Sequence, residues 1–359
     1  MKIAVLGSGG GGTAVAFDWA LAGHDLHMFD FEEFPANIKA INDTGGIHSE
    51  GQLEGFAKIT YAGHDIEKVV VGADIVFVVG PAYSTKAFGD ACRPFIKKGQ
   101  TVVVCPGSCG GAIVFKNALG VELKNDDVIV AETHTLPYAT RLVSPGNIKV
   151  YLKLVDGIYL AAHPYKYTIK VKAMVRQLYP AIIPAANILQ TALQNANPVI
   201  HPAVTLLNTA LIERTGGDFN FYEEGVTPAV GKLIKAVDEE RIAVGKKLGL
   251  DIISDPELGV IQGYMQEASY DRGYIEARGF KGIKAQSQLD YRYFTEDAGY
   301  GLVFISDLGR FAGVSTPVID SLIQIVSVLL EKNYMIEKPR SLKSLGLDGY
   351  TVNSIKDVL

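Results

Sequence analysis

The chain has 359 residues, of which 48% are hydrophobic and 20% charged, and its formal net charge at pH 7 is −5. This length favours two domains, and the apolar content is too high for a disordered chain. The acidic balance, without a long basic run, argues against nucleic acid as the main partner. No stretch of about 18 apolar residues is present, so we predict no membrane span.

The cysteine content and the N-terminus point to a reducing compartment. The three cysteines, Cys92, Cys105 and Cys109, are too few for a disulfide scaffold, and no Cys or His pair gives them the spacing of a zinc site. The apolar run at residues 3–6 is too short for the core of a signal peptide. We therefore expect a cytoplasmic protein with buried or loop thiols and no bound metal.

Short apolar runs alternate with helical stretches in the first half of the chain. The runs lie at residues 2–6, 24–30, 73–80, 101–105 and 128–131. Between the first two, Ala14, Phe17 and Leu21 recur at helical spacing, and Gly23 ends the pattern. Strands that alternate with helices predict a doubly wound parallel α/β sheet.

From about residue 187 the pattern is mostly helical. Thr227-Pro228 and Thr316-Pro317 each resemble a helix N-cap followed by proline at the first helical position. The second pair is followed by an apolar stripe made of Ile319, Leu322, Ile323, Val326, Leu329 and Leu330. We therefore place an α/β domain at residues 1–186 and an all-α domain at residues 187–359. The apolar helix near the C-terminus would serve either the domain core or the interface of a homodimer.

A glycine-rich loop directly follows the first predicted strand. Residues 7–12 read Gly-Ser-Gly-Gly-Gly-Gly and fit the G-x-G-x-x-G pattern at Gly7, Gly9 and Gly12. In a Rossmann-type domain, the first glycine permits the tight turn, the second lets a pyrophosphate approach the backbone, and the third allows the helix to pack on the strand. We expect the cofactor to contact Gly7, Ser8, Gly9, Gly10 and Gly12. The alternative is a loop that is merely flexible.

An acidic residue and two turns extend this predicted cofactor site. Asp30 ends the second strand, where a carboxylate accepts hydrogen bonds from the adenosine ribose. Glu32 and Glu33 follow, with no Arg or Lys to meet a 2′-phosphate, so we expect NAD rather than NADP. Pro81 and Ser108 follow later strands at the edge where ligands of open sheets bind. Asp30 as a simple turn residue is the alternative.

The histidines supply one candidate for proton transfer. His24, His27, His48, His64 and His163 are expected at the surface or in turns, and His134 follows a strand. His201 stands between Pro198 and Pro202, and because proline is tolerated in the first turn of a helix, this predicts a position near a helix N-terminus. A helix dipole lowers the pKa of a histidine and a nearby carboxylate raises it, so such a residue suits acid–base chemistry near neutral pH. Position alone favours a structural histidine over a catalytic one.

Several segments of the second half resemble the opine dehydrogenase family. They are residues 197–202 (Asn-Pro-Val-Ile-His-Pro), 221–228, 292–297 with 301–303, and 342–349. Together with the glycine loop, the resemblance covers nearly the whole chain. It is nearest to the bacterial N-(1-D-carboxyethyl)-L-norvaline dehydrogenase type and more distant to octopine dehydrogenase. It implies a C-terminal domain like that of 6-phosphogluconate dehydrogenase.

The resemblance also implies a reaction and roles for site residues. The family condenses an L-amino acid with a 2-oxo acid such as pyruvate and reduces the imine with NADH. His201 matches its catalytic histidine, Asp297 the paired aspartate and Arg292 an arginine that holds the oxo acid carboxylate. Three further positions match its substrate-binding segments, namely Glu132, Thr133 and Ser108. The spacing there departs from the octopine type, so Thr135 remains an alternative to Thr133.

Two other functions remain open from the sequence. One is a 2-oxo acid reductase related to ketopantoate or glycerol-3-phosphate dehydrogenases, which would need no amine. The other is a non-enzymatic NAD(H)-binding protein, in which Asp30 would be present without the chemistry of His201.

Overall fold

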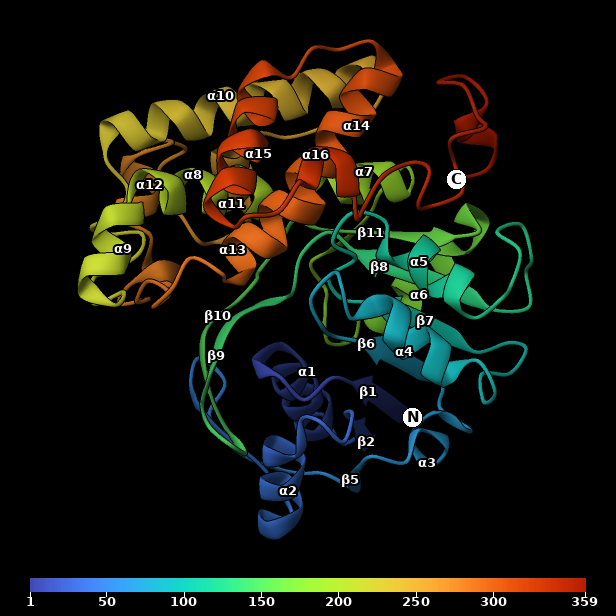
Figure 1. Ribbon diagram of the computed structural model, residues 1–359. Helices are drawn as coiled ribbons and strands as arrows, with labels where there is room; N and C mark the ends of the chain where they lie inside the picture. The colour runs from blue at the N-terminus through green and yellow to red at the C-terminus, as the bar shows by residue number, and fades with distance from the viewer. The chain divides into compact units, whose positions relative to one another are not determined.

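The computed structural model describes residues 1–359, and the chain divides into two compact units (Figure 1). The first comprises Met1–Thr191 together with Val358–Leu359, and the second comprises Ala192–Asp357. The first unit is α/β, and the second contains helices and a single isolated β-bridge. The predicted fold class, a parallel-sheet domain followed by an all-α domain, is confirmed.

The first unit is built on an eight-stranded sheet, here called the main sheet. Its order is β12 (Ile182–Pro184), β11 (Ile158–His163), β8 (Ile129–Thr133), β7 (Thr101–Val104), β6 (Ile75–Val78), β1 (Lys2–Leu6), β2 (Asp25–Phe29) and β5 (Tyr61–Gly63). All neighbours are parallel except β8 and β11. The inner strands β6, β7 and β8 are buried along their whole length, which explains their continuous apolar runs.

The register of the main sheet brings the predicted loops to one edge. Leu6 pairs with Phe29 on one side and with Val78 on the other. Val78 pairs with Val104, and Val104 pairs with Glu132. These five residues form one row across the sheet, so the segments that follow them share its carboxyl edge.

A second, four-stranded sheet was not predicted. Its order is β4 (Gly55–Lys58), β3 (Gly46–Gly51), β10 (Asn147–Lys153) and β9 (Tyr138–Ser144). Helix α1 (Gly10–Leu21) contacts strands of both sheets, and Figure 1 shows the β9–β10 ribbon passing beside it. Asp18 of α1 accepts a hydrogen bond from Tyr138 at 2.6 Å and pairs with Lys153 at 2.7 Å. Strands of both sheets cover helix α1, which explains why its residues are apolar on nearly all sides.

The remaining helices of the first unit follow the strands of the main sheet. They are α2 (Pro35–Thr44), α3 (Ile66–Val70), α4 (Thr85–Cys92), α5 (Gly111–Ala118), the short 3₁₀ helix η1 (Tyr165–Tyr167) and α6 (Thr168–Val175). Helix α7 (Ile188–Gln194) spans the division between the units.

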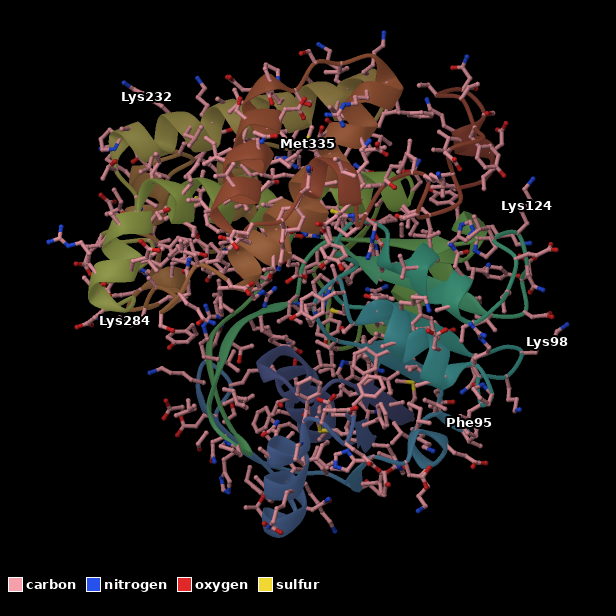
Figure 2. All side chains as sticks on the ribbon, in the orientation of Figure 1. Phe95, Lys98, Lys124, Lys232, Lys284 and Met335 are labelled. Carbon is pink, nitrogen blue, oxygen red and sulfur yellow. The ribbon has the colours of Figure 1, made fainter.

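The prediction that His163 lies at the surface or in a turn is wrong. His163 ends strand β11 and is only 1% exposed. Burial, with a smaller contribution from Lys116, lowers the pKa of His163 to about 4. Lys116 is itself buried and donates hydrogen bonds to the carbonyl oxygens of Leu123 and Asn125, at 2.7 and 2.6 Å. By contrast, Lys98 and Lys124 point away from the unit into solvent (Figure 2).

The second unit is a set of packed helices. They are α8 (Asn197–Leu207), α9 (Thr209–Thr215), α10 (Pro228–Lys247), α11 (Asp255–Gln262), α12 (Arg272–Ile275), 3₁₀ helix η2 (Arg278–Phe280), α13 (Arg292–Thr295), π-helix η3 (Asp297–Leu302), α14 (Val303–Ala312), α15 (Pro317–Leu329), α16 (Tyr334–Glu337) and 3₁₀ helix η4 (Ile355–Asp357). Helix α8 packs against α10, α13 and η3. None of the helices in the chain is both long and apolar enough to cross a bilayer.

The predicted helix signals at two prolines are confirmed. The Thr227 side chain accepts a hydrogen bond from the N–H of Val230 at 3.3 Å and caps α10. Thr316 is the N-cap residue of α15, although its side chain makes no cap hydrogen bond. The first four residues of the α15 stripe are buried, whereas Leu329 is 38% exposed. The stripe is therefore shorter than predicted.

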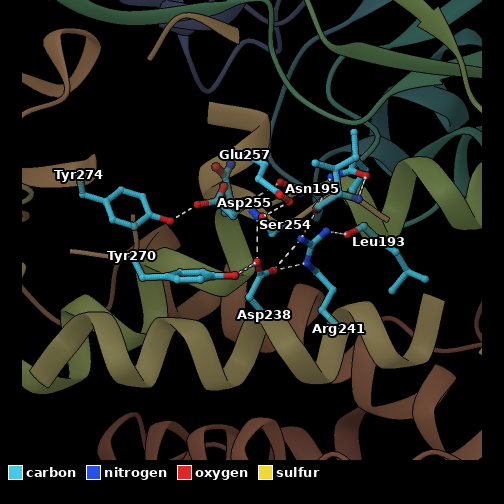
Figure 3. Close-up of polar contacts among 12 residues, drawn as sticks. Leu193, Asn195, Asp238, Arg241, Ser254, Asp255, Glu257, Tyr270 and Tyr274 are labelled. Atoms are coloured by element: carbon cyan, nitrogen blue, oxygen red, sulfur yellow. Dashed lines mark hydrogen bonds and ion pairs between the residues drawn. The ribbon is translucent and has the colours of Figure 1, made fainter. Parts of the chain in front are cut away.

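A buried polar cluster joins α10 to two other segments of the second unit (Figure 3). Asp238 and Arg241 of α10 are fully buried, and Arg241 Nε donates to Asp238 Oδ1 at 2.7 Å. Arg241 also donates to the carbonyl oxygens of Leu193 and Ile253. Asp238 Oδ2 accepts from the N–H of Asp255 at 2.8 Å. Both charges are thus paired, and the cluster fixes the chain at residues 193 and 253 relative to α10.

Candidate active site

Two glycines of the loop leave no room for a side chain. Gly7 has a φ of +104°, and a Cβ there would lie 2.1 Å from the carbonyl oxygen of Val79. A Cβ at Gly12 would lie 1.9 Å from the carbonyl oxygen of Gly7. Only glycine fits at either position, so helix α1 packs tightly against the turn that follows β1.

Gly9 differs from its neighbours, because a Cβ there would meet nothing within 4 Å. It is the N-cap residue of α1, and its carbonyl oxygen accepts the N–H of Thr13 at 2.9 Å. The first turn of a helix leaves N–H groups without intrahelical partners and carries the positive end of the dipole. Open space beside such groups fits the pyrophosphate of a dinucleotide.

Asp30 is bound to the glycine loop itself. Its Oδ2 accepts hydrogen bonds from the N–H of Ser8 at 2.7 Å and from the Ser8 hydroxyl at 2.6 Å. Its Oδ1 accepts the N–H of Phe31 at 2.9 Å. Each carboxylate oxygen accepts about two hydrogen bonds, so Oδ1 has capacity for a ribose hydroxyl.

The loop has two further supports that the sequence did not reveal. The Thr13 hydroxyl donates to the carbonyl oxygen of Ser8 at 2.9 Å, and the Asn37 amide donates to the same oxygen. Asn37 also accepts the N–H of Gly146 at 2.5 Å, which links the loop to the turn between β9 and β10. A single polar residue in helix α2 carries no recognisable signal, so only the structure identifies Asn37.

Pro81 and Ser108 lie in the loops after β6 and β7, as the strand assignment predicted. The carbonyl oxygen of Pro81 accepts hydrogen bonds from the Ser84 N–H and hydroxyl, at 2.9 and 2.8 Å. Ser108 is 8% exposed and, with a φ of +39°, adopts the left-handed conformation that non-glycine residues rarely take. Both residues thus shape the turns at the carboxyl edge of the main sheet.

Glu132 and Thr133 end β8 at the same edge and are almost fully buried. The Glu132 carboxylate accepts the N–H of Ala112 at 2.9 Å and the hydroxyl of Thr191 at 2.6 Å. The Thr133 hydroxyl donates to the carbonyl oxygen of Thr135 at 2.8 Å. Glu132 therefore caps the first turn of α5, and both side chains have partners within the unit.

His201 and Asp297 are brought together in the second unit. His201 Nδ1 lies 2.7 Å from Asp297 Oδ2, and both side chains are more than nine-tenths buried. Helix α8 begins at Asn197 and π-helix η3 begins at Asp297, and these two elements pack against each other. As predicted, His201 lies near a helix N-terminus, as the fifth residue of α8, but Pro202 lies inside the helix and not in its first turn.

Two tyrosines lie against His201 and were not singled out from the sequence. The Tyr222 hydroxyl lies 3.0 Å from His201 Nε2. The ring of Tyr293 stacks on the imidazole, with centroids 3.9 Å apart and an interplanar angle of 24°. Both tyrosines occur inside the segments that resemble the family, and their position next to charged residues was the available signal.

Arg292 is the first residue of α13, five residues before Asp297. Its Nη2 is 3.1 Å from Oε2 of Glu296, whose side chain is 4% exposed, whereas the Arg292 side chain is 44% exposed. Glu296, and more weakly Asp297, raise the pKa of Arg292, which keeps the guanidinium charged. A guanidinium anchored on one side and exposed on the other is able to bind a carboxylate.

The structure shows no group of three or more His, Cys, Asp or Glu side chains arranged to hold a metal ion. All three cysteines are reduced and buried, and burial raises the pKa of Cys92 and of Cys105 to about 12. The thiols of Cys92 and Cys105 are therefore poor nucleophiles and metal ligands at neutral pH.

Two family models match the chain. The N-terminus of NAD-dependent glycerol-3-phosphate dehydrogenase matches residues 2–108, and the alpha-helical domain of NAD/NADP octopine/nopaline dehydrogenase matches residues 184–330. A ketopantoate reductase of the PanE/ApbA family from Ralstonia eutropha JMP134 shares the fold, with a TM-score of 0.61 at 19% identity over 93% of this chain and 99% of its own.

Two further comparisons cover almost the whole length. A solved structure of octopine dehydrogenase with NADH and L-arginine superposes with a TM-score of 0.77 at 17% identity, over 99% of this chain and 97% of that one. An opine dehydrogenase from Arthrobacter sp. (strain 1C) is 34% identical over 99% of this chain and 98% of its own. The chain therefore belongs to the opine dehydrogenase family and is an NAD-dependent oxidoreductase acting on CH–NH bonds.

Proposed function

We propose that His201 is the acid–base residue of this opine dehydrogenase, that Asp297 orients it and that Arg292 binds the carboxylate of the oxo acid. The enzyme joins an L-amino acid to a 2-oxo acid such as pyruvate and reduces the resulting imine. The observation that carries the assignment is the 2.7 Å contact between His201 Nδ1 and Asp297 Oδ2 in a buried setting. A buried histidine with one nitrogen fixed by a carboxylate is the arrangement that proton transfer needs.

The reaction requires a proton at a defined place. Addition of the amine to the oxo carbon gives a carbinolamine, whose hydroxyl must be protonated before it leaves as water. His201 supplies this proton, and Asp297 stabilises the imidazolium that does so. Stacking on Tyr293 favours the same charged ring. When bound, NADH supplies the hydride that reduces the imine.

Substrate binding is assigned to two groups of residues. Arg292, held by Glu296, pairs with the oxo acid carboxylate through its exposed side. In the first unit, Ser108 and Thr133 lie at the carboxyl edge of the main sheet. Thr135 is less buried than Thr133, whose hydroxyl is bound to the Thr135 carbonyl, so we favour Thr135 as the residue that contacts substrate. Glu132 would then have a structural role, in which its hydrogen bonds to Ala112 and Thr191 stabilise this edge of the sheet.

The cofactor assignment rests on the glycine loop and Asp30. Gly9 and Gly10 at the start of α1 would hold the pyrophosphate, and Asp30 Oδ1 would accept a ribose hydroxyl. The exposed Glu32 and Glu33 would repel a 2′-phosphate. We therefore propose NADH over NADPH, and a strong kinetic preference for NADPH would contradict this choice.

The deciding experiment is NADH oxidation with pyruvate and a panel of L-amino acids. We expect turnover that requires both substrates, whereas a simple 2-oxo acid reductase would need no amine. Absence of turnover for every pair, with NADH bound, would favour a non-enzymatic NAD(H)-binding protein.

Two variants test the residues. His201→Ala should abolish turnover while leaving the Kd for NADH unchanged, and His48→Ala, at an exposed position, is its control. Asp297→Asn should lower kcat by about 10²- to 10⁴-fold, and Asp290→Asn, at an exposed position nearby, is its control. Equal losses of turnover and NADH affinity in His201→Ala would indicate a structural histidine.

A homodimer is a further proposal. Helix α15 exposes Ile325, Val328 and Leu329, and the following helix α16 exposes Ile336. Light scattering on the purified protein measures the oligomeric state directly. A dimer that Val328→Glu converts to a monomer would support α15 as the interface, and a monomeric wild-type protein would contradict it.

A further inference from the structure

Both ring nitrogens of His201 face a polar side chain. Nδ1 lies 2.7 Å from Asp297 Oδ2, and Nε2 lies 3.0 Å from the hydroxyl of Tyr222. The acid–base role proposed above uses Nε2, because Asp297 occupies the other nitrogen. The atom that must exchange a proton with substrate is therefore in contact with a phenol.

The chemistry of the three groups sets the direction of these hydrogen bonds. An ionised carboxylate only accepts, so Nδ1 carries a hydrogen and Nε2 of the neutral ring is an acceptor. The Tyr222 hydroxyl then donates to Nε2. When the ring is protonated, Nε2–H donates to the Tyr222 oxygen instead. A hydroxyl is both donor and acceptor, so Tyr222 keeps the contact in both states of His201.

The ring of Tyr222 is held in place by aromatic neighbours. It stacks on Phe280 with centroids 4.1 Å apart and an interplanar angle of 14°, and Phe221 meets it edge-on at 5.0 Å. Tyr222 is only 5% exposed. Turning the hydroxyl away from Nε2 would break this stack and leave buried polar atoms to be satisfied elsewhere. The hydroxyl is thus fixed on the side of His201 opposite Asp297.

We propose that Tyr222 relays the proton between His201 and the substrate. This inference rests on the proposed function, in which His201 is the acid–base residue. In the dehydration step, the Nε2 proton of the imidazolium moves to the Tyr222 oxygen, and the Tyr222 proton moves to the carbinolamine hydroxyl. The C–O bond breaks, its electron pair leaves with water, and the nitrogen lone pair forms the C=N bond. His201 ends neutral and Tyr222 is unchanged.

The first test is Tyr222→Phe, which removes the hydroxyl and keeps the ring that stacks on Phe280. We expect kcat for the condensation to fall by about 10²-fold, with little change in the Kd for NADH. Tyr264→Phe is the matched control, because Tyr264 also stacks on Phe280, with centroids 4.8 Å apart. Its kcat should equal that of the wild type.

The second test separates a relay from a structural role. The rate of a single turnover is measured in mixtures of H₂O and D₂O. Two protons that move together give a curved dependence on the D₂O fraction, whereas one proton gives a straight line. We expect a curve for the wild type and a straight line for Tyr222→Phe.

The outcomes distinguish this inference from the function on which it rests. Full kcat in Tyr222→Phe, a rise in KM alone, or a straight line for the wild type would overturn the relay. If the relay is overturned in this way and His201→Ala is inactive in the same assays, His201 is still the acid–base residue but acts without Tyr222. If His201→Ala is as active as the wild type, the proposed function itself fails.

Discussion

Asp30 accepts both the main-chain N–H and the hydroxyl of Ser8 on one carboxylate oxygen, at 2.7 and 2.6 Å. The same carboxylate that is expected to bind the ribose thus also holds the glycine loop. Asp30→Ala should therefore weaken NADH binding by about 10- to 100-fold, since hydrogen bonds to a charged group contribute about 1.5–3 kcal/mol each. Fluorescence titration of NADH measures this Kd.

Two companion variants divide the roles of Asp30. Ser8→Ala removes only the hydroxyl bond, so its loss of NADH affinity should be smaller than that of Asp30→Ala. Glu33→Ala, at an exposed position, should bind NADH like the wild type. An Asp30→Ala variant with unchanged NADH affinity would show that the carboxylate contributes to neither loop nor ribose.

The glycines of the loop predict opposite behaviour for two similar substitutions. Gly9→Ala places a Cβ in open space, so the thermal midpoint should not change, but NADH affinity should fall at least about 10-fold because the methyl group occupies the room for a pyrophosphate. Gly12→Ala places a Cβ 1.9 Å from the Gly7 carbonyl oxygen and should lower both the thermal midpoint and the NADH affinity. Gly349→Ala, also in open space, is the control. Calorimetry and NADH titration check all three, and equal losses in Gly9→Ala and Gly12→Ala would contradict the assignment.

The fold was predictable where one physical signal dominates. The buried strands β1, β6 and β7 are continuous apolar runs, and the caps at Thr227 and Thr316 precede proline. The small sheet was missed because its strands are short or partly exposed and lack such a run. Strand β9, for example, is exposed from Arg141 to Ser144. Its pairing with β10 and the parallel pairing of β10 with β3 are non-local contacts.

The candidate site was predictable to a different degree in each unit. The pattern at residues 7–12 and Asp30 required only local spacing, and the structure places them at one edge of the main sheet. His201 and Asp297 are 96 residues apart, and only the family resemblance joined them. Tyr222 and Glu296 were missed because a neighbouring charged residue in the sequence does not show which side chains meet in the fold.

Glu132 provides a test of structure against substrate binding. Its carboxylate accepts bonds from Ala112 and Thr191, so Glu132→Gln would turn an amide N–H toward one of these donors. In the absence of substrate, we expect the free energy of unfolding to decrease by about 1–3 kcal/mol. This decrease would be measured as a lower thermal midpoint. Thr191→Val should reproduce part of this loss of stability. Glu122→Gln, at an exposed position, is the control and should not change the thermal midpoint. An unchanged midpoint with a much higher KM for the amino acid would instead make Glu132 a substrate ligand.

The burial of His163 predicts a loss of stability in acid. The unfolded chain protonates this residue near the ordinary pKa of 6.5, whereas burial lowers the pKa in the folded protein to about 4. Between these pH values the unfolded state binds a proton that the folded state does not. The free energy of unfolding therefore decreases as the pH falls, by about 3 kcal/mol at pH 4. His163→Leu removes this proton and should flatten the decline of the thermal midpoint from pH 7 to 4.5. His48→Leu, at an exposed position of β3, should follow the wild-type curve, and parallel curves for all three proteins would contradict the prediction.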